Sequence, residues 1–178
     1  MPLDLQPVLT GELVRVRPLV PDDFAALRRI AADPAVWEQH PSKDRTEAVA
    51  FREWFGEAME SGGALVVEDR VSNEVIGTSR LVRRAEDEVE IGWTFLAPSR
   101  WGGAWNGELK RLMLDHVFDV VSRVVFTVHS GNIRSQRAVE RLGAIRVGTA
   151  PDCRGRGENV VFHLSRQDHV DLRRPGTA

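Results

Sequence analysis

The chain has 178 residues, of which 42% are hydrophobic and 28% charged, a balance typical of one globular domain with a continuous core. A formal net charge of −2 argues against nucleic acid or an anionic membrane as the main partner, and a single cysteine excludes an internal disulfide framework. No apolar run reaches membrane-spanning length and no signal pattern opens the chain, so we expect a cytoplasmic protein that binds neither nucleic acid nor membrane.

The N-terminal third is expected to hold a leader, a strand and a helix. Residues 1–8 show no periodicity and are expected to form a flexible leader. Alternating apolar and basic residues predict a strand over residues 13–19. The acidic residues after Pro21 predict a helix that ends at Asp33, and residues 35–45 favour a loop or a short helical turn.

A second helix and three strands follow. Thr46 is expected to cap this helix, whose apolar face is formed by Val49, Trp54, Phe55 and Ala58. Strands are predicted over residues 64–68, 74–82 and 88–96, and the short polar turns between them favour antiparallel hairpins.

A glycine-rich turn, residues 101–106, leads from the third of these strands into a helix predicted over residues 106–121. Its glycines free unpaired amides and the helix N-terminus adds a partial positive charge, so the turn is a candidate phosphate site. It lacks the ending of a P-loop and the glycine spacing of a dinucleotide-binding turn. A plain strand-to-helix connection therefore stays open as the alternative.

The last elements of the predicted domain, residues 9–165, alternate between strand and helix patterns. We expect a strand over 124–129, a helix over 132–142, strands over 144–149 and 159–164 around a loop at 150–157, and a polar tail over 166–178.

Two motifs resemble a known family. Residues 132–144, NIRSQRAVERLGA, are similar to the N-x-x-S-x-x-A-x-x-x-L-G-[AF] signature of the GCN5-related N-acetyltransferases (GNATs). Residues 101–116, WGGAWNGELKRLMLDH, resemble the branch typified by the ribosomal-protein alanine and serine N-acetyltransferases. The resemblance spans residues 9–164. It implies the single-domain α/β GNAT fold, a mixed and mostly antiparallel sheet with one splayed parallel strand pair and flanking helices.

The resemblance also implies a cofactor and an acceptor. Acetyl-CoA is expected as co-substrate without a metal, and the acceptor is a primary amine of a small molecule or a peptide N-terminus, acetylated by direct attack through a tetrahedral intermediate. The expected cofactor-binding residues are Trp93, Thr94, Phe95, Leu96, Trp101, Gly102, Gly103, Ala104, Trp105, Asn106, Asn132 and Ser135. For Asn132 and Ser135, helix capping is the alternative role.

Acyl transfer to an amine needs a group that accepts the amine proton and a path that protonates the leaving thiolate. Glu90, on the strand that leads into the expected cleft, is the first candidate base and acceptor contact, with a solvated strand carboxylate as the alternative. His129, at a strand end, is the second candidate base or a structural histidine. Ser135 is the candidate acid, because many relatives use a tyrosine and this chain has none. Trp37 either walls the acceptor pocket or packs on the core edge.

Two positions depart from the family pattern. Ala104 stands where a glycine is common, which puts phosphate binding in doubt, and Val147 stands where many relatives carry a glutamate. These departures and the missing tyrosine support a competing hypothesis, a CoA-binding module with little or no catalysis. The loop at residues 153–156 is either an anion-binding lid or a solvated loop, and Cys153 lacks the partner motif of a nucleophile. A homodimer is left open.

Overall fold

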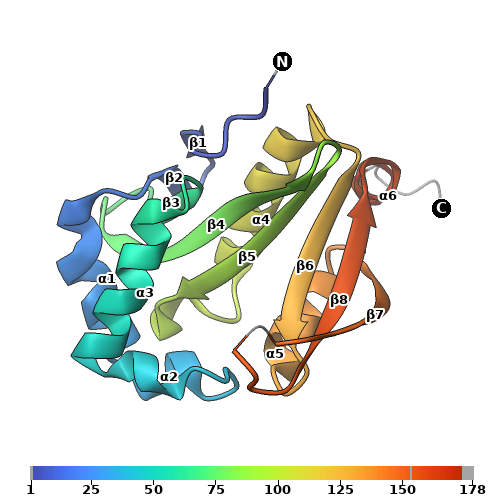
Figure 1. The fold of residues 1–178 in the computed structure, drawn as a ribbon. Helices are drawn as coiled ribbons and strands as arrows, with labels where there is room; N and C mark the ends of the chain where they lie inside the picture. Colours follow the sequence, from blue (N-terminus) through green and yellow to red (C-terminus); the bar gives the residue numbers. More distant parts are fainter. Residues whose placement is uncertain (1, 153, 174–178) are drawn as a thin grey trace.

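Eight strands form one mixed sheet. They are β1 (Leu9–Thr10), β2 (Val14–Pro18), β3 (Ala64–Asp69), β4 (Val75–Ala85), β5 (Glu88–Leu96), β6 (Arg123–His129), β7 (Ile145–Pro151) and β8 (Glu158–Ser165). In the computed structural model, which describes residues 2–152 and 154–173, their order is β1-β2-β3-β4-β5-β6-β8-β7 (Figure 1). Every neighbouring pair is antiparallel except β5 and β6, which confirms the expected mixed sheet with one parallel pair.

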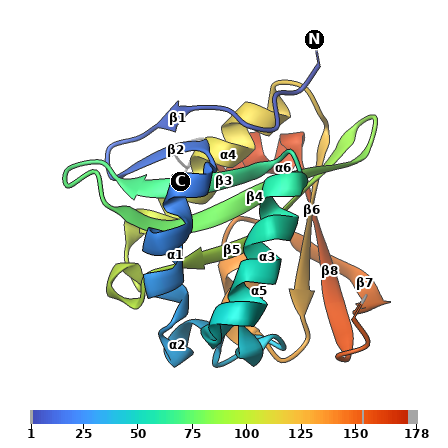
Figure 2. The ribbon, with the colours of Figure 1, turned by 60° about the vertical axis from the view of Figure 1, so that its left-hand side comes forward.

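Helices cover both faces of this sheet. They are α1 (Phe24–Ala31), α2 (Pro34–Trp37), α3 (Ala48–Glu60), α4 (Ala104–Phe118), α5 (Ile133–Glu140) and α6 (Arg166–Arg173), with 3₁₀ turns at Pro21–Asp23, Lys43–Thr46 and Pro98–Arg100. One apolar core lies between the sheet and α4 and α5, and a second lies under α1, α2 and α3. In Figure 2, α1 and α3 lie in front of the sheet and α4 lies behind it. None of the helices in the described ranges is long and apolar enough to cross a bilayer.

Helix α3, the helix that was predicted to begin after Thr46, differs from its prediction in its cap and in one core residue. It begins at Ala48 after Glu47, and Thr46 instead donates a hydrogen bond to the Lys43 carbonyl inside the preceding 3₁₀ turn. Val49 was placed on the apolar face but is 71% exposed. Phe51 takes that place, because it shares a helix face with Trp54, Phe55 and Ala58 at three- and four-residue spacing.

The segments before and after the predicted domain both contact α4 or the core. Leu3 is buried, and His116 Nε2 donates a hydrogen bond of 2.7 Å to the Asp4 carbonyl, so the predicted leader lies against α4. The predicted tail begins with α6, where His169 Nε2 lies 2.8 Å from Asp115 Oδ1 of α4. Neither contact can be predicted from the sequence, because each one depends on a single pair of residues that lie far apart in the chain. The predicted domain boundaries themselves stay predictions.

A β-bulge in β5 opens the sheet. Thr78 pairs with Phe95 and Arg80 with Gly92, so Trp93 and Thr94 together lie opposite one residue of β4. Trp93 has φ 51°, a left-handed conformation that is rare for an aromatic residue. The pairing of β5 with β6 ends at Glu90, and residues 91–96 diverge from the second half of β6.

Helix α4 is attached to the β1–β2 corner through Glu108. Its carboxylate accepts hydrogen bonds from the backbone N–H groups of Glu12, Leu13 and Val14 at 2.9, 2.7 and 2.9 Å. A Cβ on Gly11 would lie 2.5 Å from this carboxylate, which is why a glycine suits that position. Burial alone would raise the pKa of Glu108, but the three backbone donors outweigh burial and lower it below its ordinary value.

Helix α4 is attached to the bulge through Lys110. This side chain is buried, and its Nζ donates to Thr94 Oγ1 at 2.5 Å and to Ser79 Oγ at 3.3 Å. Ser79 and Thr94 also share a hydrogen bond of 2.8 Å between their hydroxyls. Burial lowers the pKa of Lys110 to about 7.

We expect Glu108→Gln to lower the free energy of unfolding by about 1–3 kcal/mol at pH 7, because the amide replaces a carboxylate that accepts three backbone donors. Urea denaturation measures the loss. Since the pKa of Glu108 is lowered on folding, its stabilisation is present above the ordinary glutamate pKa and is lost as pH falls through the folded value. Glu140→Gln, at an exposed position, is the control. Equal stability of wild type and Glu108→Gln at pH 7 would contradict the assignment.

We expect wild-type stability to rise from about pH 7 towards pH 10.5, the folded and ordinary pKa values of Lys110. In that window the unfolded chain holds a proton that the folded chain has released, so unfolding takes up a proton and becomes less favourable as pH rises. Lys110→Met should remove this rise, and Lys43→Met, at the other, exposed lysine of the chain, should keep it. Parallel pH profiles for wild type and Lys110→Met would show that Lys110 keeps its ordinary pKa.

Candidate active site

A cavity of about 640 Å³ lies where β5 and β6 diverge. Residues 91–96 of β5 form one wall and residues 126–129 of β6 the other. The turn before α4 and the start of α5 line one end, and α2 with the residues that follow it lines another. The splayed parallel pair therefore produces a continuous space that reaches several elements.

Most residues proposed from the sequence meet in this cavity. Its lining includes Trp37, Trp93, Thr94, Phe95, Leu96, Trp101, Gly102, Gly103, Asn106, His129, Asn132 and Ser135. Three proposed residues, Glu90, Ala104 and Trp105, do not line it. The lining also includes Lys110, His40, Arg45 and Arg134, which the sequence analysis did not select.

The glycine turn ends earlier than expected. Helix α4 begins at Ala104 instead of Asn106, so Ala104 is a helical residue, for which alanine is well suited. The residue that needs a left-handed backbone is Gly102, with φ 72°. Gly103 occupies the N-cap, and no side chain of the described residues caps the helix. The first amides of this 15-residue helix therefore have no side-chain acceptor, as an anion site requires.

The start of α5 combines a cap with unused polar groups. Asn132 Oδ1 accepts a hydrogen bond of 3.1 Å from the Ser135 N–H, so Asn132 has the capping role that was given as its alternative. Ser135 Oγ and Asn132 Nδ2 have no hydrogen-bond partner in the part of the chain that the structure describes. Both residues line the cavity.

Arg134 connects two walls of the cavity. Its guanidinium carbon lies 3.9 Å from the centre of the Trp101 ring, and Nη2 donates to the Val36 carbonyl at 3.4 Å. The Trp101 indole in turn donates to the Leu96 carbonyl at 2.9 Å. This stack ties the turn after β5 to α5 and α2, and the N-x-x-S motif gives no indication of it.

Glu90 lies just outside the cavity. It is 3% exposed, and Arg84 Nε donates to its Oε2 at 2.6 Å. Oε1 has no hydrogen-bond partner among the described residues. Gly92, which does line the cavity, would place a Cβ 3.8 Å from Oε1 if it carried one.

Two histidines in the cavity lining already use ring nitrogens. His129 Nδ1 accepts from the Gly131 N–H at 3.2 Å, and Nε2 lies 3.1 Å from the Arg156 carbonyl, to which it donates. His129 as a second base stays a prediction, and the contacts fit the structural alternative equally. The pKa of His40 falls to about 3 because the ring is buried and surrounded by cations, so His40 is neutral at pH 7.

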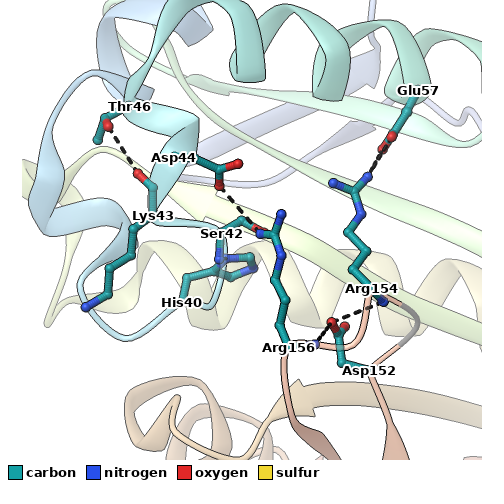
Figure 3. A network of polar contacts seen from close by, with 9 residues as sticks. All are labelled: His40, Ser42, Lys43, Asp44, Thr46, Glu57, Asp152, Arg154 and Arg156. Atoms are coloured by element: carbon teal, nitrogen blue, oxygen red, sulfur yellow. Dashed lines mark hydrogen bonds and ion pairs between the residues drawn. The ribbon is translucent and has the colours of Figure 1, made fainter.

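The loop between β7 and β8 contacts the α3 side of the cavity (Figure 3). Arg154 Nη2 lies 2.6 and 2.7 Å from the two carboxylate oxygens of Glu57. Arg156 Nη1 donates to Ser42 Oγ at 2.6 Å and lies 3.5 Å from Asp44 Oδ1. These contacts tie the loop to α3 and to the turn before it. Cys153, which the sequence analysis did not select as a nucleophile, lies outside the described residues.

The comparisons with known proteins agree with this geometry. Residues 14–145 match the family model described as "Acetyltransferase (GNAT) domain". The crystal structure of a GCN5-related N-acetyltransferase from Brucella melitensis is 22% identical, with a TM-score of 0.80 over 94% of this chain and 82% of that chain. An acetyltransferase of the GNAT family from Bacillus anthracis is 19% identical, with a TM-score of 0.73 over 90% and 99%.

A third structure carries ligands. Spermidine N-acetyltransferase from Vibrio cholerae, solved with CoA and spermine, is 15% identical, with a TM-score of 0.67 over 90% of this chain and 99% of that chain. At these identities the structures show a shared fold. Since the family model covers most of the sequence, the chain belongs to the GNAT family of acetyltransferases.

Proposed function

We propose that the protein transfers the acetyl group of acetyl-CoA to a primary amine. The observation that carries this proposal is the cavity between β5 and β6, which joins the uncapped start of α4 to the α3 side of the sheet. The amides of Gly103 to Asn106 suit a pyrophosphate, and the diverging edge of residues 93–96 suits an amide-rich arm. Asn132 and Ser135 add further polar groups to the cavity lining.

The chemistry needs little from the protein beyond alignment and proton transfer. When bound, acetyl-CoA supplies a thioester carbonyl. The amine nitrogen forms the new C–N bond with the carbonyl carbon as the C–S bond breaks, the amine loses one proton, and the sulfur takes one up. Oxyanion stabilisation would come from N–H groups along residues 93–96.

We propose that Glu90 accepts the proton of the acceptor amine through a bridging water molecule. The carboxylate does not line the cavity, so direct contact with the acceptor is not part of the proposal. Its Oε1 is unused, and Gly92, without a side chain, leaves space between Oε1 and the cavity. Ser135 Oγ, unused and in the lining, is the proposed donor to the sulfur. Ser135 would thereby take the role of the tyrosine that this chain lacks.

The branch of the family, the kind of acceptor and the cellular location are proposed mainly from the sequence. The motif over residues 101–116 supports the ribosomal-protein N-acetyltransferase branch, and with it a peptide N-terminus or a small amine as acceptor. The cytoplasmic location that we propose rests on the single cysteine, since cysteine-poor chains are typical of a reducing compartment. The Vibrio cholerae relative acts on spermidine, so a small amine fits a protein of this fold.

The alternative is a CoA-binding module without catalysis. Val147 is 48% exposed on β7 and offers no proton acceptor, which favours this alternative if Glu90 is inactive. Steady release of free thiol from acetyl-CoA with a panel of primary amines decides between the two. A module that only binds CoA gives no release above hydrolysis.

We expect CoA at 100 times its Kd to raise the free energy of unfolding by about 2.7 kcal/mol, because it binds only the folded chain. Thermal unfolding measures the shift. Gly103→Val should reduce it, since a β-branched side chain blocks close approach of phosphate, while its Cβ meets only Trp105 at 3.4 Å. Gly148→Val, where a Cβ meets nothing within 4 Å, is the control. No shift with millimolar CoA on folded wild type would rule out the cofactor assignment.

We expect Glu90→Gln to slow turnover by about 10²–10⁴-fold at pH 7 with little change in CoA affinity, because the amide cannot accept the proton. The defect should shrink as pH rises and more acceptor amine is already neutral. Ser135→Ala should lower turnover without this recovery. Initial rates of thiol release across pH provide the measurement, with Glu88→Gln on the same strand as the control. Normal turnover of Glu90→Gln at pH 7 would move the role to His129 or to water alone.

A further inference from the structure

Two arginines on the α3 side of the sheet are buried without an anionic partner. Arg45 is 9% exposed and Arg80 is 7% exposed. Within the described ranges, neither guanidinium makes a hydrogen bond or an ion pair, and Nε and Nη2 of Arg80 are fully buried without a partner. A buried cation without a counter-charge is unfavourable in a protein interior. Such a residue therefore points to a ligand that supplies the charge.

Arg45 is the one that reaches the cavity. It lies in the 3₁₀ turn before α3 and belongs to the cavity lining. Its guanidinium carbon lies 5.3 Å from the Trp37 ring centre and 5.8 Å from that of Trp54, so two aromatic faces hold it in place. Burial lowers the pKa of Arg45 to about 10, which leaves the side chain charged at neutral pH.

The carboxylates that act most on Arg45 are already paired with other arginines. Glu57 and Asp44 are the acids whose fields act most on Arg45. Glu57 is held by Arg154 through both oxygens, and Asp44 lies 3.5 Å from Arg156 (Figure 3). The charges of these acids are therefore shared with other arginines, and Arg45 keeps an excess of positive charge at the cavity wall.

We propose that Arg45 binds a carboxylate of the acceptor, so that the acceptor is a primary amine that also carries a carboxylate, as an amino acid does. The inference rests on the proposed function. A guanidinium held between two tryptophans presents its N–H groups in a fixed plane, which suits the two oxygens of a carboxylate. Arg80, stacked on Trp93 at 4.9 Å, adds a second positive charge beside the same cavity wall.

The same cations disfavour a polycationic acceptor. The Vibrio cholerae relative was solved with spermine, whose ammonium groups would meet the charge of Arg45 in this chain. Like charges in a poorly hydrated site raise the free energy of the complex. The two proteins therefore share a fold but differ in the acceptors that they accept.

The test compares matched acceptors on wild-type protein. Amino acids are paired with their primary amides, which keep the amine and the shape but lose the charge, and spermine and an aminoalkyl phosphate complete the panel. Thiol release gives kcat/KM for each. We expect the acid to exceed its amide by about ten- to hundredfold, the range of a charge-assisted hydrogen-bonded pair. Equal rates for acid and amide, or preference for spermine or the phosphate, would overturn the proposal.

Substitutions of Arg45 test whether this side chain causes the preference for the acid. Arg45→Gln should lower the ratio of kcat/KM for the acid to that for the amide to about one, and Arg45→Lys should retain part of the preference. Arg52→Gln is the matched control, because Arg52 also stacks on a ring, 6.0 Å from the centre of Phe24, but does not line the cavity. An acid preference that survives Arg45→Gln would overturn the role of Arg45. If Arg45→Gln does not fold, the wild-type panel and Arg45→Lys still test whether Arg45 binds the carboxylate.

The outcomes separate this inference from the proposed function. If no amine releases thiol above hydrolysis although CoA stabilises the fold, acetyl transfer itself is wrong and the inference fails with it. If amides and spermine release thiol as fast as acids do, acetyl transfer stands and only the carboxylate site is wrong.

Discussion

The β-bulge at Trp93 and Thr94 is the constraint on which the rest of the structure depends. Strand β5 pairs with β4 along most of its length but must leave β6 after Glu90, and one extra residue in β5 provides the turn. The left-handed backbone of Trp93 is unfavourable by itself. The buried contact of Lys110 with Thr94 and Ser79 holds the bulge in place from α4. The packing of α4 and the divergence of β5 from β6 therefore depend on the same contacts.

This divergence also joins the two cores. Val139 and Phe126 belong to the core beside α4 and α5, and Trp37 and Phe95 belong to the core under α1, α2 and α3. All four line the same cavity. A sheet normally separates the layers on its two faces, but a gap between two strands lets a single ligand touch both. Cofactor and acceptor can then approach from different faces and meet between the strands.

The sequence predicted most of the fold, because hydrophobic periodicity and turn residues mark each strand and long helix. It also indicated the capping role of Asn132, and most of the site residues that its motifs predicted do line the cavity. It missed what depends on contacts between distant segments. Lys110 was visible only as one letter of a motif, and its burial follows from a bulge that no local pattern encodes. In the sequence, Arg45 cannot be distinguished from an ordinary surface charge, because its packing against Trp37 and Trp54 is a contact between separate elements of the fold.

The aromatic composition has a practical consequence for spectroscopy. The chain has five tryptophans and no tyrosine, so its near-ultraviolet fluorescence comes almost entirely from indole. Trp37, Trp93 and Trp101 line the cavity, and Trp54 and Trp105 each contact an arginine that lines it. Every fluorophore therefore lies in or next to the site. Emission from the unlabelled protein should report cavity occupancy directly, without the background that tyrosines elsewhere in a fold usually add.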